Sequence, residues 1–229
     1  MFAAIAPSYD LNNRLHSLWR DQAWRRTAVK AAAVQASDTV LDVACGTGDL
    51  TLCFADRLRQ LLGSVPAGRL YGVDFTYEML PPAVQKSTDA PPIAWLNGDA
   101  QALPVADQSV NVVSIAFGIR NVADPRVAFD EFYRVLRPGG RAVILEFSLP
   151  ENPLLRRMYN LYFRHVLPRT ATWISGDRTG AYKYLPESVN TFIDRKTMMQ
   201  MLADCGFSRI TQKTLTFGVC ICYSAEKTV

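Results

Sequence analysis

Residues 40–49 read VLDVACGTGD, an apolar run that ends in a glycine cluster and is followed at once by a helical pattern. The run has the length and composition of a buried strand. Similar apolar runs lie at residues 69–73, 93–96, 110–117 and 141–147, and helical patterns lie between them at 49–62, 77–86 and 126–136. Strands that alternate with helices predict a parallel, doubly wound α/β sheet with right-handed crossovers.

The two ends of the chain have different patterns. Residues 11–34 and 153–167 are helical, and a helix at 197–205 precedes two apolar runs at 209–212 and 215–223. The short link between these last runs predicts an antiparallel hairpin at the sheet edge. We therefore expect a Rossmann-like, seven-stranded, mostly parallel sheet with an antiparallel C-terminal strand.

One domain over residues 1–229 accommodates all of these elements. Its expected parts are an N-terminal helical cap (1–36), a cofactor-binding core (37–150), a helical segment that covers the active site (151–195) and a C-terminal helix with a strand hairpin (196–229).

Composition excludes several classes of protein. Hydrophobic residues make up 49% of the 229 residues and the net charge is +4, which is typical of an ordinary globular protein and too weak for a nucleic-acid binder. Two histidines and five scattered cysteines predict no metal site. Apolar runs fall short of the ~18 residues of a membrane helix, and no signal peptide is apparent, so we expect a cytoplasmic protein.

The glycine loop restricts the ligand. Gly46 and Gly48 allow a ligand to approach the backbone at the carboxyl end of the first strand. The third glycine of a dinucleotide site is replaced by Thr51, and no P-loop lysine follows. Asp49 stands where a phosphate would bind at a helix start. A cationic ligand without phosphates, such as S-adenosylmethionine, fits better.

Two acids follow the next two strands. Asp74 ends the second strand, where a carboxylate can accept both ribose hydroxyls, although it can also cap the following helix. Asp99 follows the third strand, where it can accept from an adenine amino group, although the NGD sequence is also typical of a turn.

The motif series resembles that of class I S-adenosylmethionine-dependent methyltransferases. The relevant stretches are VLDVACGTGD, GVD (72–74), NGDAQALP (97–104) and RVLRPGGRAVILEF (134–147). A closer resemblance, to the ubiquinone/menaquinone biosynthesis C-methyltransferases, rests on FGIRNV (117–122), HVLPR (165–169), GAYKYLPESV (180–189) and FAAIAPSYDLNN (2–13). It implies methylation of a ring carbon of a polyprenylated hydroquinone.

The resemblance also implies a set of cofactor residues. Ala116 is a departure from the Ser that many members have, and Cys45 replaces a more usual Gly. The residues expected to bind S-adenosylmethionine are Cys45, Gly46, Thr47, Gly48, Asp74, Asp99, Ala100, Ala116 and Phe117.

The chemistry requires a nucleophilic ring carbon, which forms when a quinol hydroxyl loses its proton. Arg120 and Asn121 lie just beyond the end of the fourth strand, beside the expected methyl position. We predict that Arg120 stabilises the phenolate and that Asn121 fixes the geometry, with Tyr9 and Asp10 closing over the ring. Alternatively, Arg120 forms an ion pair with an acid such as Asp124.

Basic charge gathers on the segments outside the core. Between residues 152 and 176 there are four arginines and no acid, interleaved with apolar and aromatic residues, and residues 14–30 repeat the pattern. This is typical of helices at an anionic membrane surface, here the inner face of the membrane that holds the quinol. Alternatively, the apolar residues roof the active site and the arginines are merely solvated.

Several alternatives remain. The substrate is most simply a demethylmenaquinol, with a benzoquinol as the alternative. A methyltransferase acting on another small molecule or on nucleic acid, a binding protein without activity, and a nicotinamide dehydrogenase are less well supported: the motif for base methylation and the third glycine are missing. We expect no nucleic-acid partner, and the sequence leaves a homodimer open.

Overall fold

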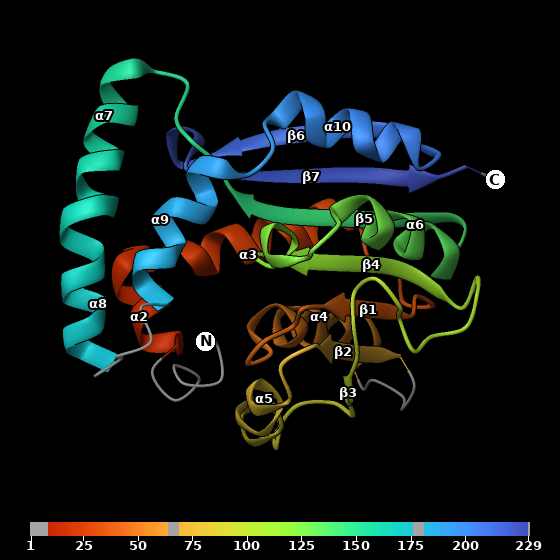
Figure 1. The fold of residues 1–229 in the computed structure, drawn as a ribbon. Helices are drawn as coiled ribbons and strands as arrows, with labels where there is room; N and C mark the ends of the chain where they lie inside the picture. Colours follow the sequence, from red (N-terminus) through yellow and green to blue (C-terminus); the bar gives the residue numbers. More distant parts are fainter. Residues whose placement is uncertain (1–8, 64–68, 176–180, 229) are drawn as a thin grey trace.

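The described strands form a single layer. The computed structural model describes residues 9–63, 69–175 and 181–228. Their 7-stranded sheet has the order β3-β2-β1-β4-β5-β7-β6 (Figure 1). The strands are β1 (Val40–Val43), β2 (Leu70–Asp74), β3 (Ala94–Asn97), β4 (Val110–Ala116), β5 (Leu136–Phe147), β6 (Phe207–Leu215) and β7 (Cys220–Lys227). Only β7 runs antiparallel to its neighbours, β5 and β6, so the predicted Rossmann-like sheet is confirmed.

The last three strands differ in extent from their predictions. β5 begins at Leu136 rather than at residue 141, because the pairing with β4 jumps from Val110–Leu136 to Val112–Arg141 and the Pro-Gly-Gly stretch bulges between these pairs. The closing hairpin is confirmed, but β6 is longer than the predicted 209–212, β7 begins at Cys220 rather than at residue 215, and a 3-10 turn at Thr216–Gly218 separates them.

Helices lie on both faces of the sheet and at one end of it. They are α2 (Tyr9–His16), α3 (Arg20–Ala31), α4 (Asp49–Leu62), η2 (Tyr77–Met79), α5 (Leu80–Lys86), η3 (Ile119–Asn121), α6 (Pro125–Val135), α7 (Pro153–Leu161), the π-helical η4 (Tyr162–Val166), α8 (Leu167–Ser175), α9 (Ala181–Thr191) and α10 (Arg195–Asp204). Leu18 and Trp19 have positive φ and separate α2 from α3, so the N-terminal helical pattern forms two helices.

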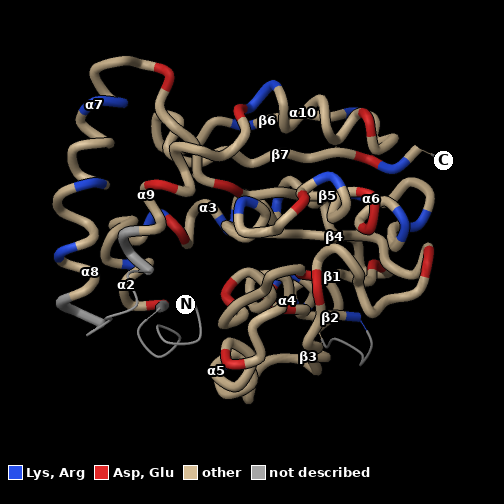
Figure 2. Tube along the Cα trace, viewed as in Figure 1, with Lys and Arg blue, Asp and Glu red and all other residues tan. Residues whose placement is uncertain are grey.

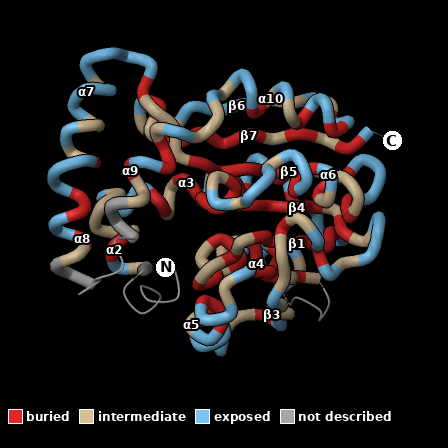
Figure 3. The backbone as a smooth tube through the Cα atoms, in the orientation of Figure 1, coloured by how far each residue is buried: buried red, intermediate tan, exposed pale blue. Residues whose placement is uncertain are grey.

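The hydrophobic core has two halves because successive residues of a strand face opposite sides. Val112 and Leu145 pack with Trp24, Phe54 and other residues of α3 and α4 on one face. On the other face, Val113 and Ile144 pack with residues of α6 and α10, among them Phe129 and Leu202. The central strands appear buried along most of their length in Figure 3, as an interior sheet covered on both faces requires.

The helices at the strand ends build a separate wall. Figure 1 shows α7 and α8 as one long column beside α2 and α9, at the side of the sheet where β4 and β5 end. The π-helical turn η4 joins α7 to α8, which extends the predicted helix at 153–167 as far as Ser175. In η4 and α8, the residues Phe163, Leu167 and Ala171 are buried and form a small hydrophobic cluster. No helix in the described ranges is both long enough and apolar enough to cross a bilayer.

A buried carboxyl lies in the middle of the central strand. Asp42 of β1 is 1% exposed and accepts hydrogen bonds from Thr51 Oγ1 of α4 and Ser114 Oγ of β4, both at 2.6 Å. Burial raises the pKa of Asp42 from 3.8 to about 6, although the two hydroxyls partly oppose the shift. Asp42 therefore ties the first turn of α4 to the two central strands.

We expect Asp42 to make stability depend on pH. Because its folded pKa is raised, its stabilising contribution is complete below pH 3.8 and is lost as the pH rises through about 6. Asp42→Asn keeps the shape but cannot titrate. The free energy of unfolding of the wild type, relative to the variant, should fall by about 3 kcal/mol between these pH values in urea titrations. A constant difference across that range would contradict the assignment.

Candidate active site

The loop after β1 turns through left-handed backbone conformations. Ala44, Gly46 and Gly48 have φ of 50°, 56° and 83°. The two glycines meet different needs. The Gly46 N–H donates to Asp74 Oδ2 at 2.7 Å, which ties the loop to the end of β2. A Cβ at Gly48 would lie 2.6 Å from the Trp95 ring, so packing against β3 requires this glycine.

A hollow of about 350 Å³, here called the cofactor cleft, lies at the carboxyl ends of β1, β2 and β4. Ligands bind at this position in open α/β sheets, where the strand order reverses. Of the residues predicted to bind or methylate, those that line the cleft are Gly46, Asp74, Asp99, Ala100, Ala116, Phe117 and Asn121. Cys45 and Thr47 instead line a side chamber of about 30 Å³, and Gly48 is against Trp95.

Asp74 stands at the end of β2 with both carboxylate oxygens engaged. Oδ2 accepts from Gly46 N, and Oδ1 accepts from Thr76 N at 2.8 Å. Burial raises the pKa of this carboxyl, and the two backbone N–H groups oppose the shift. Each oxygen keeps a second lone pair, so the group can hold the loop and also accept from a ligand in the cleft.

Asp99 forms a turn, which was the alternative prediction for the NGD sequence, and it also lines the cofactor cleft. Its Oδ1 accepts from Gln101 N at 2.9 Å, and Asp99 pairs with Ala102 in an isolated bridge. Asn97 was not predicted: its Nδ2 donates to the carbonyl of Asp74 at 2.8 Å and so braces the neighbouring strand end. Asn97 opens the NGDAQALP motif, but the sequence alone does not show that its side chain reaches back to β2.

A second hollow, the aromatic cavity, has a volume of about 370 Å³ and lies between the sheet and the helical wall. Its aromatic lining comprises Trp24, Phe117, Phe147, Tyr159, Tyr162, Phe163 and Tyr184. Phe117 lines both this cavity and the cofactor cleft, and its φ of 57° is unusual for a bulky residue. The two hollows therefore meet at the residue that follows β4.

Arg120 lines the aromatic cavity and forms a buried ion pair. Its Nη1 lies 2.8 Å from Glu146 Oε1, and the two side chains are 6% and 1% exposed. Nη1 also donates to the Phe117 carbonyl at 2.6 Å. The sequence suggested Asp124 as an ion-pair partner, but Asp124 caps α6 by accepting from Arg126 N. Glu146 was missed because it lies 26 residues away along the chain.

Two tyrosines complete this end of the cavity. The Tyr159 hydroxyl is buried and has no hydrogen-bond partner within the described part of the chain. Burial raises the pKa of Tyr159 well above its usual value, so the group stays protonated and can donate. Tyr184 Oη donates to Asn121 Oδ1 at 3.2 Å, which links α9 to the cofactor cleft. Neither tyrosine was among the predicted site residues.

The N-terminal helix α2 lies against the glycine loop. Thr47 Oγ1 donates to Asp10 Oδ1 at 2.5 Å, and Lys86 Nζ donates to Asp10 Oδ2 at 2.7 Å. Asp10 thus contacts the loop, where we had expected it to close over the ring. Tyr9 begins α2, but its side chain lies outside the described part of the structure.

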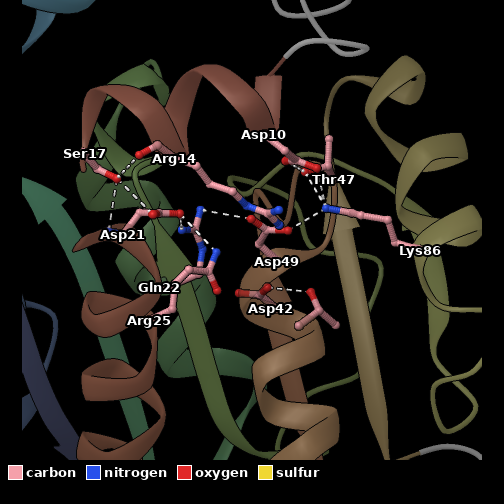
Figure 4. A network of polar contacts seen from close by, with 11 residues as sticks. Asp10, Arg14, Ser17, Asp21, Gln22, Arg25, Asp42, Thr47, Asp49 and Lys86 are labelled. Atoms are coloured by element: carbon pink, nitrogen blue, oxygen red, sulfur yellow. Dashed lines mark hydrogen bonds and ion pairs between the residues drawn. The ribbon is translucent and has the colours of Figure 1, made fainter. Parts of the chain in front are cut away.

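A polar network extends from this contact (Figure 4). Lys86 Nζ lies 2.6 Å from Asp49 Oδ1, and Arg25 Nη2 lies 3.9 Å from Asp49 Oδ2. Burial raises the pKa of Asp49, but Arg25 and Lys86 outweigh it, so the net shift is downward. Asp49 is therefore ionised, but Arg25 and Lys86 compensate its charge. Repulsion between Asp49 and a phosphate is consequently weaker than the sequence alone suggested.

Solved structures with this architecture define the class. A chain of the complex between the Haloferax volcanii Trm112 methyltransferase activator and a methyltransferase aligns with a TM-score of 0.68 at 19% identity, over 100% of this chain and 98% of that one. An S-adenosylmethionine-dependent methyltransferase from Thermotoga maritima aligns with a TM-score of 0.65 at 17% identity, over 100% of both chains. The fold is that of class I methyltransferases.

Sequence relatives identify the family. The model of the ubiE/COQ5 methyltransferase family matches residues 1–227, and the chain belongs to this family. The ubiquinone/menaquinone biosynthesis C-methyltransferase UbiE of Syntrophotalea carbinolica is 43% identical over 98% of this chain and 91% of its own length. The demethylmenaquinone methyltransferase of Thermus thermophilus is 43% identical over 99% of this chain and 100% of its own. The protein is therefore an S-adenosylmethionine-dependent methyltransferase.

The cleft fits this cofactor. Asp74 offers carboxylate oxygens where a ribose would lie, and the adjoining side chamber contains buried charged groups that suit an amino-acid moiety. Among these groups, Arg25 Nε has no hydrogen-bond partner within the described residues.

The two glycines of the loop should respond differently to alanine. Both substitutions strain a positive φ by about 1 kcal/mol, but only Gly48→Ala also drives a Cβ into Trp95. Gly48→Ala should therefore lower the free energy of unfolding by about 1–3 kcal/mol more than Gly46→Ala, measured by urea denaturation without ligand. Equal losses would show that Trp95 yields at little cost.

Proposed function

We propose that this enzyme transfers the methyl group of S-adenosylmethionine to a ring carbon of a polyprenylated hydroquinone, converting a demethylmenaquinol to a menaquinol. The relatives in Syntrophotalea carbinolica and Thermus thermophilus, a ubiquinone/menaquinone biosynthesis C-methyltransferase and a demethylmenaquinone methyltransferase, support this substrate class. A benzoquinol is the alternative substrate, and assays of both quinols with the purified enzyme would distinguish them.

The observation that carries the proposal is the meeting of two unlike hollows at Phe117. The cofactor cleft contains the acids Asp74 and Asp99 beside small and apolar residues at the strand ends, whereas seven aromatic side chains among the described residues line the aromatic cavity. A flat aromatic substrate suits the second hollow, because rings stack favourably on rings. Because the two hollows adjoin at Phe117, a ring in the aromatic cavity would lie next to the cofactor cleft, and methyl transfer requires this proximity.

The residues at the shared wall suit the chemistry. When bound, S-adenosylmethionine supplies an electrophilic methyl group on a cationic sulfur. The protein must favour the phenolate form of the quinol, because this form makes the ring carbon nucleophilic. Arg120 is permanently cationic, and its Nη2 has no hydrogen-bond partner in the described part of the chain, so this group is free to stabilise a phenolate.

Neighbouring side chains have supporting roles in the proposal. The Tyr159 hydroxyl, which has no hydrogen-bond partner among the residues that the structure describes, donates to a quinol oxygen, since a buried donor needs an acceptor. Asn121 lines the cofactor cleft, and its hydrogen bond to Tyr184 fixes the wall between the two ligands. We keep Tyr9 as a residue that closes over the ring, because it begins the helix that Asp10 fastens to the glycine loop.

The role of Arg120 needs a test that separates charge from folding. Removing Arg120 alone leaves Glu146 buried and unpaired, which is expected to cost about 3–5 kcal/mol of stability. The double variant Arg120→Gln/Glu146→Gln removes both charges. It should keep its affinity for S-adenosylmethionine in calorimetry while single-turnover methyl transfer falls about 100-fold or more.

Tyr159→Phe provides a smaller, independent change. It removes only the hydroxyl, and methyl transfer should fall by about tenfold without loss of stability.

If the Arg120/Glu146 double variant transfers methyl at the wild-type rate, the electrostatic role of Arg120 is wrong.

We also propose that the helical wall rests on an anionic membrane surface. Leu154, Met158 and Leu161 are 67%, 60% and 63% exposed and fall on one face of α7 by their spacing. Figure 2 shows basic positions along the α7–α8 column and no acidic ones within these helices. Leu18 is 79% exposed and also lines the aromatic cavity, so the cavity reaches the surface beside this wall, where a lipid tail can leave it.

Liposome flotation tests this contact. The wild type should float with vesicles containing phosphatidylglycerol, less in high salt, and much less with phosphatidylcholine alone. Leu154→Ser/Met158→Ser/Leu161→Ser should abolish flotation, whereas Val84→Ser/Val127→Ser, at exposed apolar positions outside the wall, should not. Absence of salt-sensitive binding by the wild type would favour an aromatic roof surrounded by solvated arginines.

A further inference from the structure

Arg25 is a buried cation on α3, outside the predicted cofactor residues. Its side chain is 7% exposed, and Nη1 donates to Asp21 Oδ2 at 2.6 Å. Nη2 lies 3.9 Å from Asp49 Oδ2, which is too long for a hydrogen bond. Nε is buried and has no hydrogen-bond partner within the described residues. An orphaned charged donor is costly unless a ligand satisfies it.

The surroundings of Arg25 indicate where that ligand lies. Arg25 lines the side chamber together with residues of the glycine loop, and Figure 4 shows its side chain reaching toward Asp49 at the start of α4. The chamber shares Ala44, Gly46 and Ala116 with the cofactor cleft, so it continues that cleft. A volume of about 30 Å³ admits a small polar group but no ring.

The chemistry of the cofactor supplies such a group. If the adenosine of S-adenosylmethionine lies between Asp74 and Asp99, the amino-acid part must lie elsewhere. This part ends in a carboxylate and an ammonium. The side chamber combines a guanidinium with the ionised Asp49, so it has a charge of each sign to offer. Guanidinium groups bind carboxylates through charge-assisted hydrogen bonds.

We propose that Arg25 binds the carboxylate of the methionyl part of S-adenosylmethionine through its free Nε donor. The inference depends on the proposed function only in the identity of this ligand. Arg25 also lines the aromatic cavity, next to Trp24. Cofactor binding therefore fixes a residue of the cavity wall, and α3 serves both ligands.

Ligands that differ in one group test the contact. Calorimetry would compare S-adenosylmethionine with decarboxylated S-adenosylmethionine, which keeps the sulfonium and the amine, and with 5′-methylthioadenosine, which lacks the whole amino-acid part. Arg25→Gln should weaken binding of the first by about ten- to a hundred-fold and change the other two by less than about twofold.

Three further variants complete the test. Asp21→Asn/Arg25→Gln avoids leaving the Asp21 carboxylate unpaired and should show the same selectivity. Arg26→Gln, the exposed neighbour on α3, should bind all three ligands as the wild type does. Asp74→Ala should weaken all three, because all contain the ribose. Methylthioadenosine binding also reports whether the cleft of each Arg25 and Arg26 variant is folded.

The outcomes are distinct. Equal weakening of all three ligands by Arg25→Gln, or no weakening, would overturn the proposal. Selective loss in Arg14→Gln alone would also overturn it and assign the carboxylate to Arg14, whose buried Nε likewise has no hydrogen-bond partner in the described ranges. Failure to methylate a quinol, with intact binding of S-adenosylmethionine, would count against the proposed function and leave the assignment of Arg25 standing.

Discussion

The reversal of strand order at β1 and β4 is the constraint on which the site depends. The chain proceeds outward from β1 to β2 and β3, then returns to place β4 on the other side of β1. Connections from the two strands must therefore leave in opposite directions, which opens a crevice at their carboxyl ends. Ala44 and Phe117 follow the two strands at positive φ, so part of the backbone strain of the structure lies at this crevice.

Buried charges fasten the helical cap to this crevice. Asp10 of α2, Lys86 of α5 and Asp49 of α4 meet at the glycine loop within hydrogen-bond distance, so three helices share one ionic cluster. Fully exposed ion pairs contribute little to stability, because solvent screens them. The side chains of this cluster are at most about a quarter exposed, so their ion pairs are screened less. Charges held among partners of opposite sign fix the cap in one position over the loop, and this position encloses the side chamber.

Prediction from sequence succeeded where the controlling interactions are local. Gly46, Asp74 and Asp99 follow strands whose apolar pattern is readable, and the carboxyl ends of parallel strands necessarily meet at one edge. It missed the ion-pair partner of Arg120, because a pair with an acid of the next strand cannot be distinguished by spacing from a pair with Asp124. It also missed a packing constraint on Gly48, because Trp95, which a Cβ there would meet, lies on β3.

The sequence by itself determined the doubly wound sheet, the position of the cleft and the resemblance to a methyltransferase family, because periodicity and glycine placement act over a few residues. The tertiary structure alone decided that Phe117 lines both hollows, that Glu146 pairs with Arg120, and that the buried Tyr159 hydroxyl has no hydrogen-bond partner among the described residues. These facts depend on which surfaces long-range packing brings together. That choice arises from the summed burial of many side chains, which no single stretch of sequence encodes.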